Sequence, residues 1–292
     1  MRAFLPRSTV AGAGEPWHFA RLGIEDLHAR GVRGAGVKIA VIDTGALTDS
    51  AALHHADVTA LDGRGRPEAG IDDNGHGSSM IAIMVGADTA LCPDAAIVSI
   101  RAFSPFGIAS AAGIAQAIDI ALARGADIIN ISGGQPAVDQ ALADAVVRAT
   151  TAGVIVVAAT DNDPPFAPIY PAHAPTAIAV AASSPQDTLV NPLPASWVQI
   201  AAPGVNIATY ELDSVVQRSG TSEATAVTSA VCALVLGAVP LVQRRAVAPH
   251  VAAILAQTAN PAGNAAGPGH CGILHPPRAL TEVTNQLKGR TP

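Results

Sequence analysis

Three polar residues stand at the ends of predicted regular elements, and together they could carry out nucleophilic catalysis. Asp43 ends an apolar run (VIDTG), His76 lies between two glycines before a predicted helix (NGHG), and Ser222 begins another apolar helix (SGTSEAT). A serine hydroxyl becomes a nucleophile when a histidine removes its proton and an acid orients that histidine. The three residue types therefore predict a catalytic triad, provided that the fold brings them together.

Each of these residues also has an ordinary structural explanation. An aspartate after a strand is a common turn former, and a histidine between glycines suits a turn from loop to helix. A serine before an apolar run is a common helix N-cap, a role that Ser219 and Thr221 could fill as well as Ser222. The combination favours catalysis, because all three residues lie at the edge of a predicted element.

The apolar runs around these residues predict alternating strands and helices. This alternation indicates an α/β fold with a mostly parallel central sheet and helices on both faces. The expected strands are residues 37–43, 96–102, 127–132, 154–159, 177–182, 197–203 and 215–220. The expected helices are residues 19–31, 110–124, 137–152, 222–237, 250–258 and 278–287.

The strand ends predict where the site lies. Active sites of parallel sheets form outside the carboxyl ends of the strands. Three of the predicted strands end at Asp43, at Ser132 and just before Thr160, so these residues should converge on one edge. Residues 46–75 show no sustained hydrophobic period and predict a surface loop system.

Composition limits the classes of partner. Of the 292 residues, 49% are hydrophobic and 14% are charged, which predicts one compact domain with a large core. The net charge of -6 gives no electrostatic reason to bind nucleic acid. The most apolar stretch, residues 226–242, contains Thr228, Ser229 and Pro240, so it predicts a buried helix rather than a membrane span.

The cysteines and the first residues bear on location. Cys92, Cys232 and Cys271 are widely spaced and odd in number, which predicts buried reduced thiols rather than disulfides. The first residues lack the continuous apolar region of a secretory signal. Both observations indicate a cytoplasmic protein.

The segments VIDTG, NGHG and SGTSEAT resemble, in this order, the signature segments of the subtilisin-like serine proteases, the peptidase S8 family. The resemblance covers nearly the whole chain, including DIINISGG, VVAATDND and YPAHAPTAIAVAA. It implies a three-layer subtilisin-like peptidase domain over residues 15–288 and an N-terminal tail of residues 1–14 packed on its surface. The segments IINISGG and PRAL are also similar to proteases that trim precursor peptides in cyanobactin biosynthesis.

The resemblance implies a serine endopeptidase that acts on a peptide or protein substrate through an acyl-enzyme and needs no cofactor. Ser222 matches the nucleophile, His76 the general base, and Asp43 the acid that orients the histidine. Asn162 matches the asparagine whose amide, together with the Ser222 backbone N–H, stabilises the oxyanion.

The resemblance also implies a set of substrate-binding residues. Ser132, Gly133 and Gly134 match a strand edge along which an extended peptide pairs, although the bulky residue usual between Ser and Gly is missing. Substrate-pocket positions match Ala159, Thr160 and Asp161, and residues 163–170 match a loop that closes the pocket.

Two acids depart from the family pattern. Glu223 replaces a methionine beside the nucleophile, where it would favour the helix N-terminus or disfavour acidic substrates. Asp161 replaces a glycine, where it would raise the pKa of His76 and attract basic substrate residues. In addition, residues 78–80 replace the threonine-histidine pair that usually follows the catalytic histidine.

We expect no bound metal. Residues 85–93 are too few to contain the calcium-binding loop that many relatives insert there. The other acids upstream of His76 lack the alternating spacing of a calcium loop and predict solvated side chains. These acids are Asp49, Asp57, Asp72 and Asp73.

The sequence leaves two alternatives to the endopeptidase. A serine esterase of the α/β-hydrolase class would need its acid and histidine after the nucleophile, and no Asp follows Ser222. A catalytically inactive subtilisin-like peptide-binding module is the remaining alternative. The intact triad and Asn162 favour the enzyme.

Overall fold

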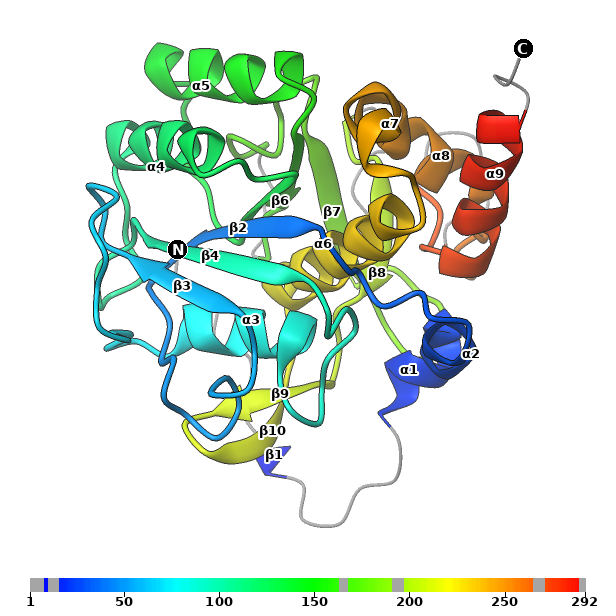
Figure 1. Cartoon of the computed structure of the whole chain (residues 1–292), viewed down its shortest axis with the longest axis horizontal. Coiled ribbons are helices and arrows are strands. Elements are labelled where there is room, and N and C mark those ends of the chain that lie inside the picture. The colour runs from blue at the N-terminus through cyan, green and yellow to red at the C-terminus, as the bar shows by residue number, and fades with distance from the viewer. Residues whose placement is uncertain (1–7, 10–15, 163–167, 191–196, 265–270, 289–292) are drawn as a thin grey trace.

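A computed structural model describes residues 8–9, 16–162, 168–190, 197–264 and 271–288 (Figure 1). The described residues form a seven-stranded sheet in the order β3-β4-β2-β5-β6-β7-β8, in which every neighbouring pair is parallel. The strands are β2 (Lys38–Asp43), β3 (Val58–Leu61), β4 (Ala96–Arg101), β5 (Ile128–Ile131), β6 (Ile155–Ala159), β7 (Ile178–Ser183) and β8 (Ile200–Pro203). The predicted parallel α/β sheet is confirmed.

Helices cover both faces of this sheet, because successive strand residues point to opposite sides. In β2, Ile39 and Val41 belong to the core under α3 (His76–Val85) and α6 (Thr221–Gly237). Ala40 and Ile42 belong to the core under α4 (Ala111–Ala123) and α5 (Gln140–Thr151). Figure 1 shows the two helix pairs on opposite sides of the sheet, which gives three layers.

Helix α6 lies in the centre of the protein. Every residue from Thr221 to Leu236 is buried, as expected for a helix without a continuous polar face. Two of its hydroxyls bond within the helix, from Thr225 Oγ1 to the Thr221 carbonyl at 2.7 Å and from Thr228 Oγ1 to the Ala224 carbonyl at 2.8 Å. In the part of the chain that the structure describes, no helix combines the length and apolarity needed to cross a bilayer.

The remaining elements surround this core. A second described sheet contains β1 (Ser8–Thr9), β10 (Ser214–Arg218) and β9 (Ile207–Glu211), and its pairs are antiparallel. The remaining helices are α1 (Trp17–Leu22), α2 (Ile24–Ala29), α7 (Leu241–Val247), a 3-10 turn (Ala248–His250), α8 (Val251–Thr258) and α9 (Pro276–Lys288). Most of the predicted tail, residues 1–14, lies outside the described residues; within it, β1 pairs with β10.

The structure differs from the sequence prediction in several places. Strand β9 was not predicted, and the strand predicted over 215–220 belongs, as β10, to the antiparallel sheet. The helix predicted over 19–31 is broken into α1 and α2 at Gly23, which adopts φ +67°. The segment predicted as a loop system, 46–75, contains β3. Only Ala60 and Leu61 of this short strand are buried, so its hydrophobic pattern is too weak to detect without its partner β4.

The three cysteines are buried and free, as predicted. Burial raises the pKa of Cys232 to about 12 and that of Cys271 to about 11, and it also raises the pKa of Cys92. Thiols with such pKa values stay protonated near neutral pH and are poor nucleophiles.

Candidate active site

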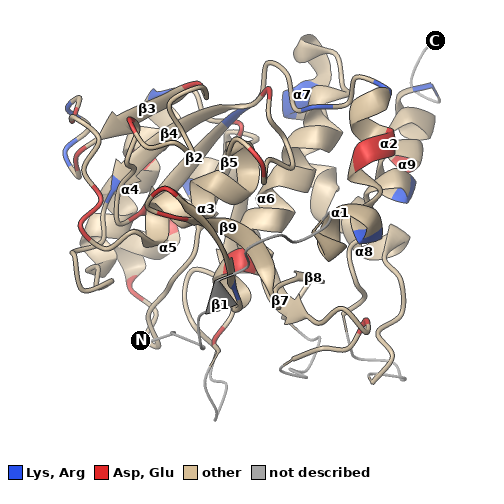
Figure 2. Ribbon diagram, turned by 90° about the horizontal axis from the view of Figure 1, so that it is seen from below, with Lys and Arg blue, Asp and Glu red and all other residues tan. Residues whose placement is uncertain are grey.

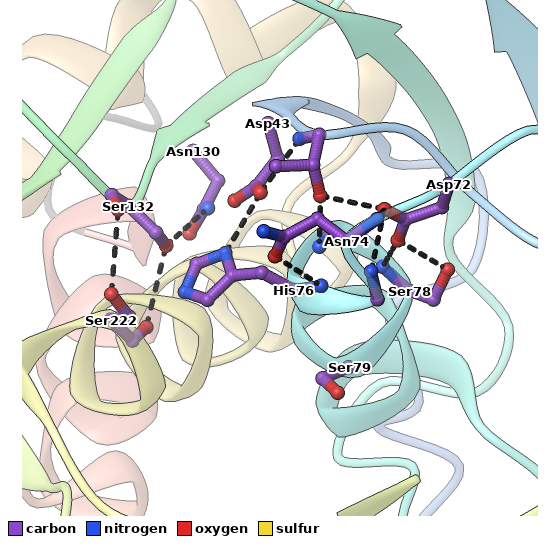
Figure 3. Close-up of polar contacts among 12 residues, drawn as sticks. Asp43, Asp72, Asn74, His76, Ser78, Ser79, Asn130, Ser132 and Ser222 are labelled. Atoms are coloured by element: carbon purple, nitrogen blue, oxygen red, sulfur yellow. Dashed lines mark hydrogen bonds and ion pairs between the residues drawn. The ribbon is translucent and has the colours of Figure 1, made fainter. Parts of the chain in front are cut away.

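The sheet and two helices bring the predicted catalytic residues together (Figure 3). Asp43 is the last residue of β2, His76 is the first residue of α3, and Ser222 lies in the first turn of α6. Because β5 pairs with β2, Ser132 just beyond β5 reaches the same edge. The predicted convergence of polar strand ends is therefore present.

Asp43 and His76 form a direct pair. His76 Nδ1 lies 2.8 Å from Asp43 Oδ1, and the same oxygen accepts the Thr44 N–H at 2.7 Å. Asp43 is 2% exposed, so these bonds offset the cost of burying its charge. A carboxylate at Nδ1 fixes the proton on that nitrogen and leaves Nε2 as the base; Figure 3 shows Nε2 pointing toward Ser222.

Ser222 lies beside the imidazole in the same cleft. Its hydroxyl donates to the Ser132 carbonyl at 3.3 Å. Catalytic hydrogen bonds are often long or misaligned before substrate binds, so this hydroxyl need not bond to Nε2 in the free protein. The arrangement can therefore support nucleophilic attack by Ser222.

A chain of buried polar residues that was not predicted from the sequence links the core to the segment around the nucleophile. Ser229 Oγ donates to Asn130 Oδ1 at 2.8 Å, and Asn130 Nδ2 donates to Ser132 Oγ at 3.1 Å. Ser132 Oγ in turn contacts the Ser222 carbonyl at 3.4 Å. Asn130 is fully buried in the apolar strand β5, and a polar residue in such a run was the available signal.

Asp72 holds the loop that presents His76. Its carboxylate accepts the Thr44 hydroxyl at 2.8 Å, the Gly75 N–H at 2.8 Å, and the N–H and hydroxyl of Ser78 at 2.8 and 2.7 Å. It thus satisfies backbone donors at the start of α3, where negative charge is favourable. The prediction that Asp72 is solvated was wrong, because it is 6% exposed.

The other three acids that were predicted to be solvated are exposed. The side chains of Asp49, Asp57 and Asp73 are exposed. Within the described ranges, no group of three or more His, Cys, Asp or Glu side chains is arranged to hold a metal ion.

Asn162 lies next to the start of α6, where an oxyanion donor is needed. Its Oδ1 accepts the Thr221 N–H at 2.9 Å, which orients the side-chain amide. A Cβ at Gly220 would lie 3.6 Å from both terminal atoms of this amide, which places the amide against the residue before α6. The NH2 group is the donor end of this side chain, and with the Ser222 N–H it can bind an oxyanion.

Glu223 introduces a second buried carboxylate beside the nucleophile. It is 4% exposed in the first turn of α6, and a Cβ at Gly220 would lie only 2.8 Å from its Oε2. Burial raises the pKa of Glu223, although the charges of His76 and Arg218 and a bond from its own N–H act in the opposite direction. Glu223 does not line the substrate-side cleft, so it acts on His76 through its charge and not by contact with a substrate in that cleft.

The pKa of His76 is raised above its ordinary value. Burial of the ring alone would lower it, but the charge and hydrogen bond of Asp43, followed by the charge of Glu223, outweigh burial; Arg218 opposes them. From the sequence, Asp161 was expected to raise the pKa of His76, whereas in the structure Asp43 and, to a smaller extent, Glu223 raise it. A raised pKa means that the basic form of His76 needs a higher pH.

A cleft of about 440 Å³ extends from the triad between two walls. One wall includes Ser132, Gly133 and Gly134, and the other is the segment between β4 and α4. A Cβ at Gly133 would lie 2.9 Å from the Phe103 ring, and one at Gly134 would lie 2.7 Å from the Tyr170 carbonyl. Only glycine permits this close packing, which keeps the strand edge accessible to a peptide backbone.

The predicted pocket residues lie away from this cleft. Ala159 and Thr160 are fully buried, and Thr160 Oγ1 donates to the Val180 carbonyl at 3.0 Å. Asp161 is partly buried. Of the loop predicted to close the pocket, residues 163–167 lie outside the described residues. The pocket role of these residues remains a prediction.

Comparison with known proteins supports the arrangement. Residues 34–273 match the family described as "Subtilase family". M-protease from Shouchella clausii is 32% identical over 238 residues, which are 78% of this chain and 61% of that protein. Subtilisin Savinase from Lederbergia lenta is 32% identical over 231 residues, which are 75% of this chain and 83% of that protein.

Two solved structures are similar in fold. The prenylagaramide maturation protease PagA has a TM-score of 0.75 and 24% identity, covering 90% of this chain and 99% of its own. MycP1, with its N-terminal propeptide removed, has a TM-score of 0.75 and 25% identity; the match covers 91% of this chain and 97% of MycP1.

Replacing Asp72 by Asn should destabilise the protein near neutral pH. Burial would raise the pKa of Asp72, but the hydrogen bonds from Ser78, Thr44 and Gly75 lower it below its ordinary value. Bonds to a charged group typically contribute about 1.5–3 kcal/mol, so we expect a loss of this size in the free energy of unfolding by urea. The depressed pKa stabilises the fold above the unfolded carboxyl value near 4, and this contribution disappears as pH falls through the folded pKa. A difference between wild type and Asp72→Asn that did not shrink in acid would contradict this.

Replacing Glu223 by Gln should move the acid limb of kcat/KM to lower pH. The substitution removes a negative charge that stabilises protonated His76, so the basic form persists at lower pH. The measurement is a pH profile of peptide hydrolysis, with Glu223→Asp as the variant that keeps the charge. An acid limb that stays in place or moves upward in Glu223→Gln would exclude this role.

Proposed function

The chain belongs to the subtilase family, and from this premise we propose that it is a serine endopeptidase with Asp43, His76 and Ser222 as its triad. The observation that carries the proposal is the 2.8 Å pair of Asp43 and His76, with the free imidazole nitrogen directed at Ser222. The chain spans only 61% of the length of M-protease. The activity is therefore proposed from the site of this chain and is not taken from that relative.

The geometry supports acyl transfer in two steps. Ser222 Oγ attacks the substrate carbonyl while His76 Nε2 takes its proton, and Asp43 stabilises the imidazolium. The oxyanion is held by the Ser222 N–H and the Asn162 NH2. His76 then gives the proton to the leaving amine. A water molecule, deprotonated by His76, attacks the acyl carbonyl, and His76 returns this proton to Ser222 Oγ as the bond from Oγ to the acyl group breaks.

We propose that the substrate binds as an extended peptide with an apolar residue upstream of the cut. Gln135 and Tyr170 exchange two backbone hydrogen bonds of 2.8 Å, which leaves the other edge of residues 133–135 facing the cleft. The opposite wall presents Phe106 and Ile108, which are 84% and 66% exposed. Strand pairing fixes the backbone, and these side chains select an apolar residue.

A precursor peptide is the finer substrate class that we propose. The support is the fold shared with a protein named as a maturation protease, together with a cleft that suits an unfolded segment. We also propose that the protein resides in the cytoplasm, because its three cysteines are free thiols and disulfides are rare in that compartment.

The activity test is labelling with a fluorophosphonate probe. Wild-type protein should be labelled at Ser222 and should cut a peptide library, whereas Ser222→Ala should lose labelling and at least about 1000-fold in turnover. Ser219→Ala is the matched control on the same segment and should remain labelled. Unlabelled wild type would favour the inactive peptide-binding module.

Substitution of the apolar wall should change substrate selection. Phe106→Ala removes an exposed side chain and should leave folding intact. We expect the preference for an apolar upstream residue to fall by about 1–2 kcal/mol, or roughly 5- to 30-fold in kcat/KM. Leu212→Ala, which removes another exposed apolar side chain outside the cleft, is the control. Preferences that are equal in Phe106→Ala and wild type would refute the assignment of this wall.

A further inference from the structure

The apolar wall of the cleft is a compact turn of residues 104–108. The Ser104 N–H donates to the Ile108 carbonyl at 2.8 Å, and the Gly107 N–H donates to the Ser104 carbonyl at 2.8 Å. Phe106 and Ile108 project from this turn and are largely exposed. Because the turn is closed by its own hydrogen bonds, a ligand packed on these side chains acts on it as a unit.

The turn is connected to both residues of the Asp43–His76 pair. At its base, the N–H groups of Ala102 and Phe103 both donate to the Asp43 carbonyl at 3.0 Å. At its tip, Asn74 Nδ2 donates to the Pro105 carbonyl at 2.7 Å.

The same Asn74 side chain contacts the first residue of α3. Asn74 Oδ1 accepts the His76 N–H at 3.3 Å (Figure 3). The Asn74 backbone is itself held by Asp72, whose Oδ1 accepts its N–H at 3.3 Å. One planar amide therefore joins the apolar wall to the backbone of the catalytic base.

We propose that Asn74 is a positioning residue that couples the filling of the apolar part of the cleft to the placement of His76. The inference rests on the proposed peptidase function. A substrate side chain that packs on Phe106 and Ile108 fixes the position of the turn and of its Pro105 carbonyl, and the amide of Asn74 links that position to the backbone of His76. Proton transfer depends steeply on the position of the base, so the coupling acts on kcat.

Two substitutions separate this coupling from simple support of His76. Asn74→Ala removes both hydrogen bonds. Asn74→Asp keeps an acceptor for the His76 N–H but loses the donor to Pro105. A purely structural role would therefore be rescued by Asp, whereas the coupling would not.

Gln135 provides a matched control. Its Nε2 donates to the Ala109 carbonyl at 3.0 Å, so it holds the far end of the same wall without contacting His76. Gln135→Glu makes the same change from amide to carboxylate as Asn74→Asp. Gln135→Glu should raise KM for a substrate whose apolar side chain occupies this part of the cleft. It should not change the ratio of kcat between that substrate and one that leaves this part of the cleft empty.

The experiment measures kcat and KM for two quenched peptides. They differ only at the residue, upstream of the cut, whose side chain packs on Phe106 and Ile108: this residue is Leu in one peptide and Gly in the other. Rates are compared on the alkaline plateau, where His76 is neutral in every variant. In wild type, kcat should be higher for the Leu peptide. A hydrogen bond contributes about 0.5–1.5 kcal/mol, so this kcat ratio should fall about 2- to 12-fold in both Asn74→Ala and Asn74→Asp.

Three outcomes would overturn the inference. The kcat ratio could survive in both Asn74 variants, Asp could restore it to the wild-type value, or Gln135→Glu could lower it equally. Wild-type protein that cuts neither peptide and takes no fluorophosphonate would instead overturn the proposed function, and the inference with it.

Discussion

The burial of Asp43 at the end of β2 is the constraint on which the site depends. A carboxylate that is 2% exposed is stable only with close partners, and here these are the Thr44 N–H and the His76 ring. His76 must therefore begin α3 at one position. Asp72 secures that position by accepting donors from the first turn of α3. One buried charge thus determines where a helix starts, and a second buried charge holds it there.

Helix α6 places the nucleophile under a different constraint. A helix buried on all sides can still carry Thr, Ser and Glu if each polar group finds a partner. Thr225 and Thr228 bond to carbonyls one turn back, and Ser229 bonds to Asn130. Glu223 lies at the favourable N-terminal end of the helix, and its charge faces His76. Buried groups of α6 therefore contribute to the electrostatic environment of Ser222 and His76.

The cleft is continuous with the triad. Its glycine-lined wall follows β5 and its apolar wall follows β4, which are the two strands beside β2. The carbonyl of Asp43 accepts two N–H groups from the apolar wall. The parallel sheet therefore sets the distance between substrate and catalytic residues, because both attach to the ends of adjacent strands.

The sequence by itself determined the parallel α/β sheet and the candidates Asp43, His76 and Ser222, because apolar runs and the polar residues at their edges are local patterns. Its resemblance to the subtilisin-like proteases added Asn162. Tertiary structure alone decided the roles of Asp72, Asn130 and Glu223. An isolated aspartate in a polar loop is indistinguishable from a solvated one until Thr44, 28 positions away, donates to it. Asn130 gains its role from Ser229, 99 positions away, and Glu223 from the approach of His76. Hydrogen bonding between distant segments is a property of the folded chain: a local pattern can mark a buried polar residue such as Asn130, but it cannot identify the partner.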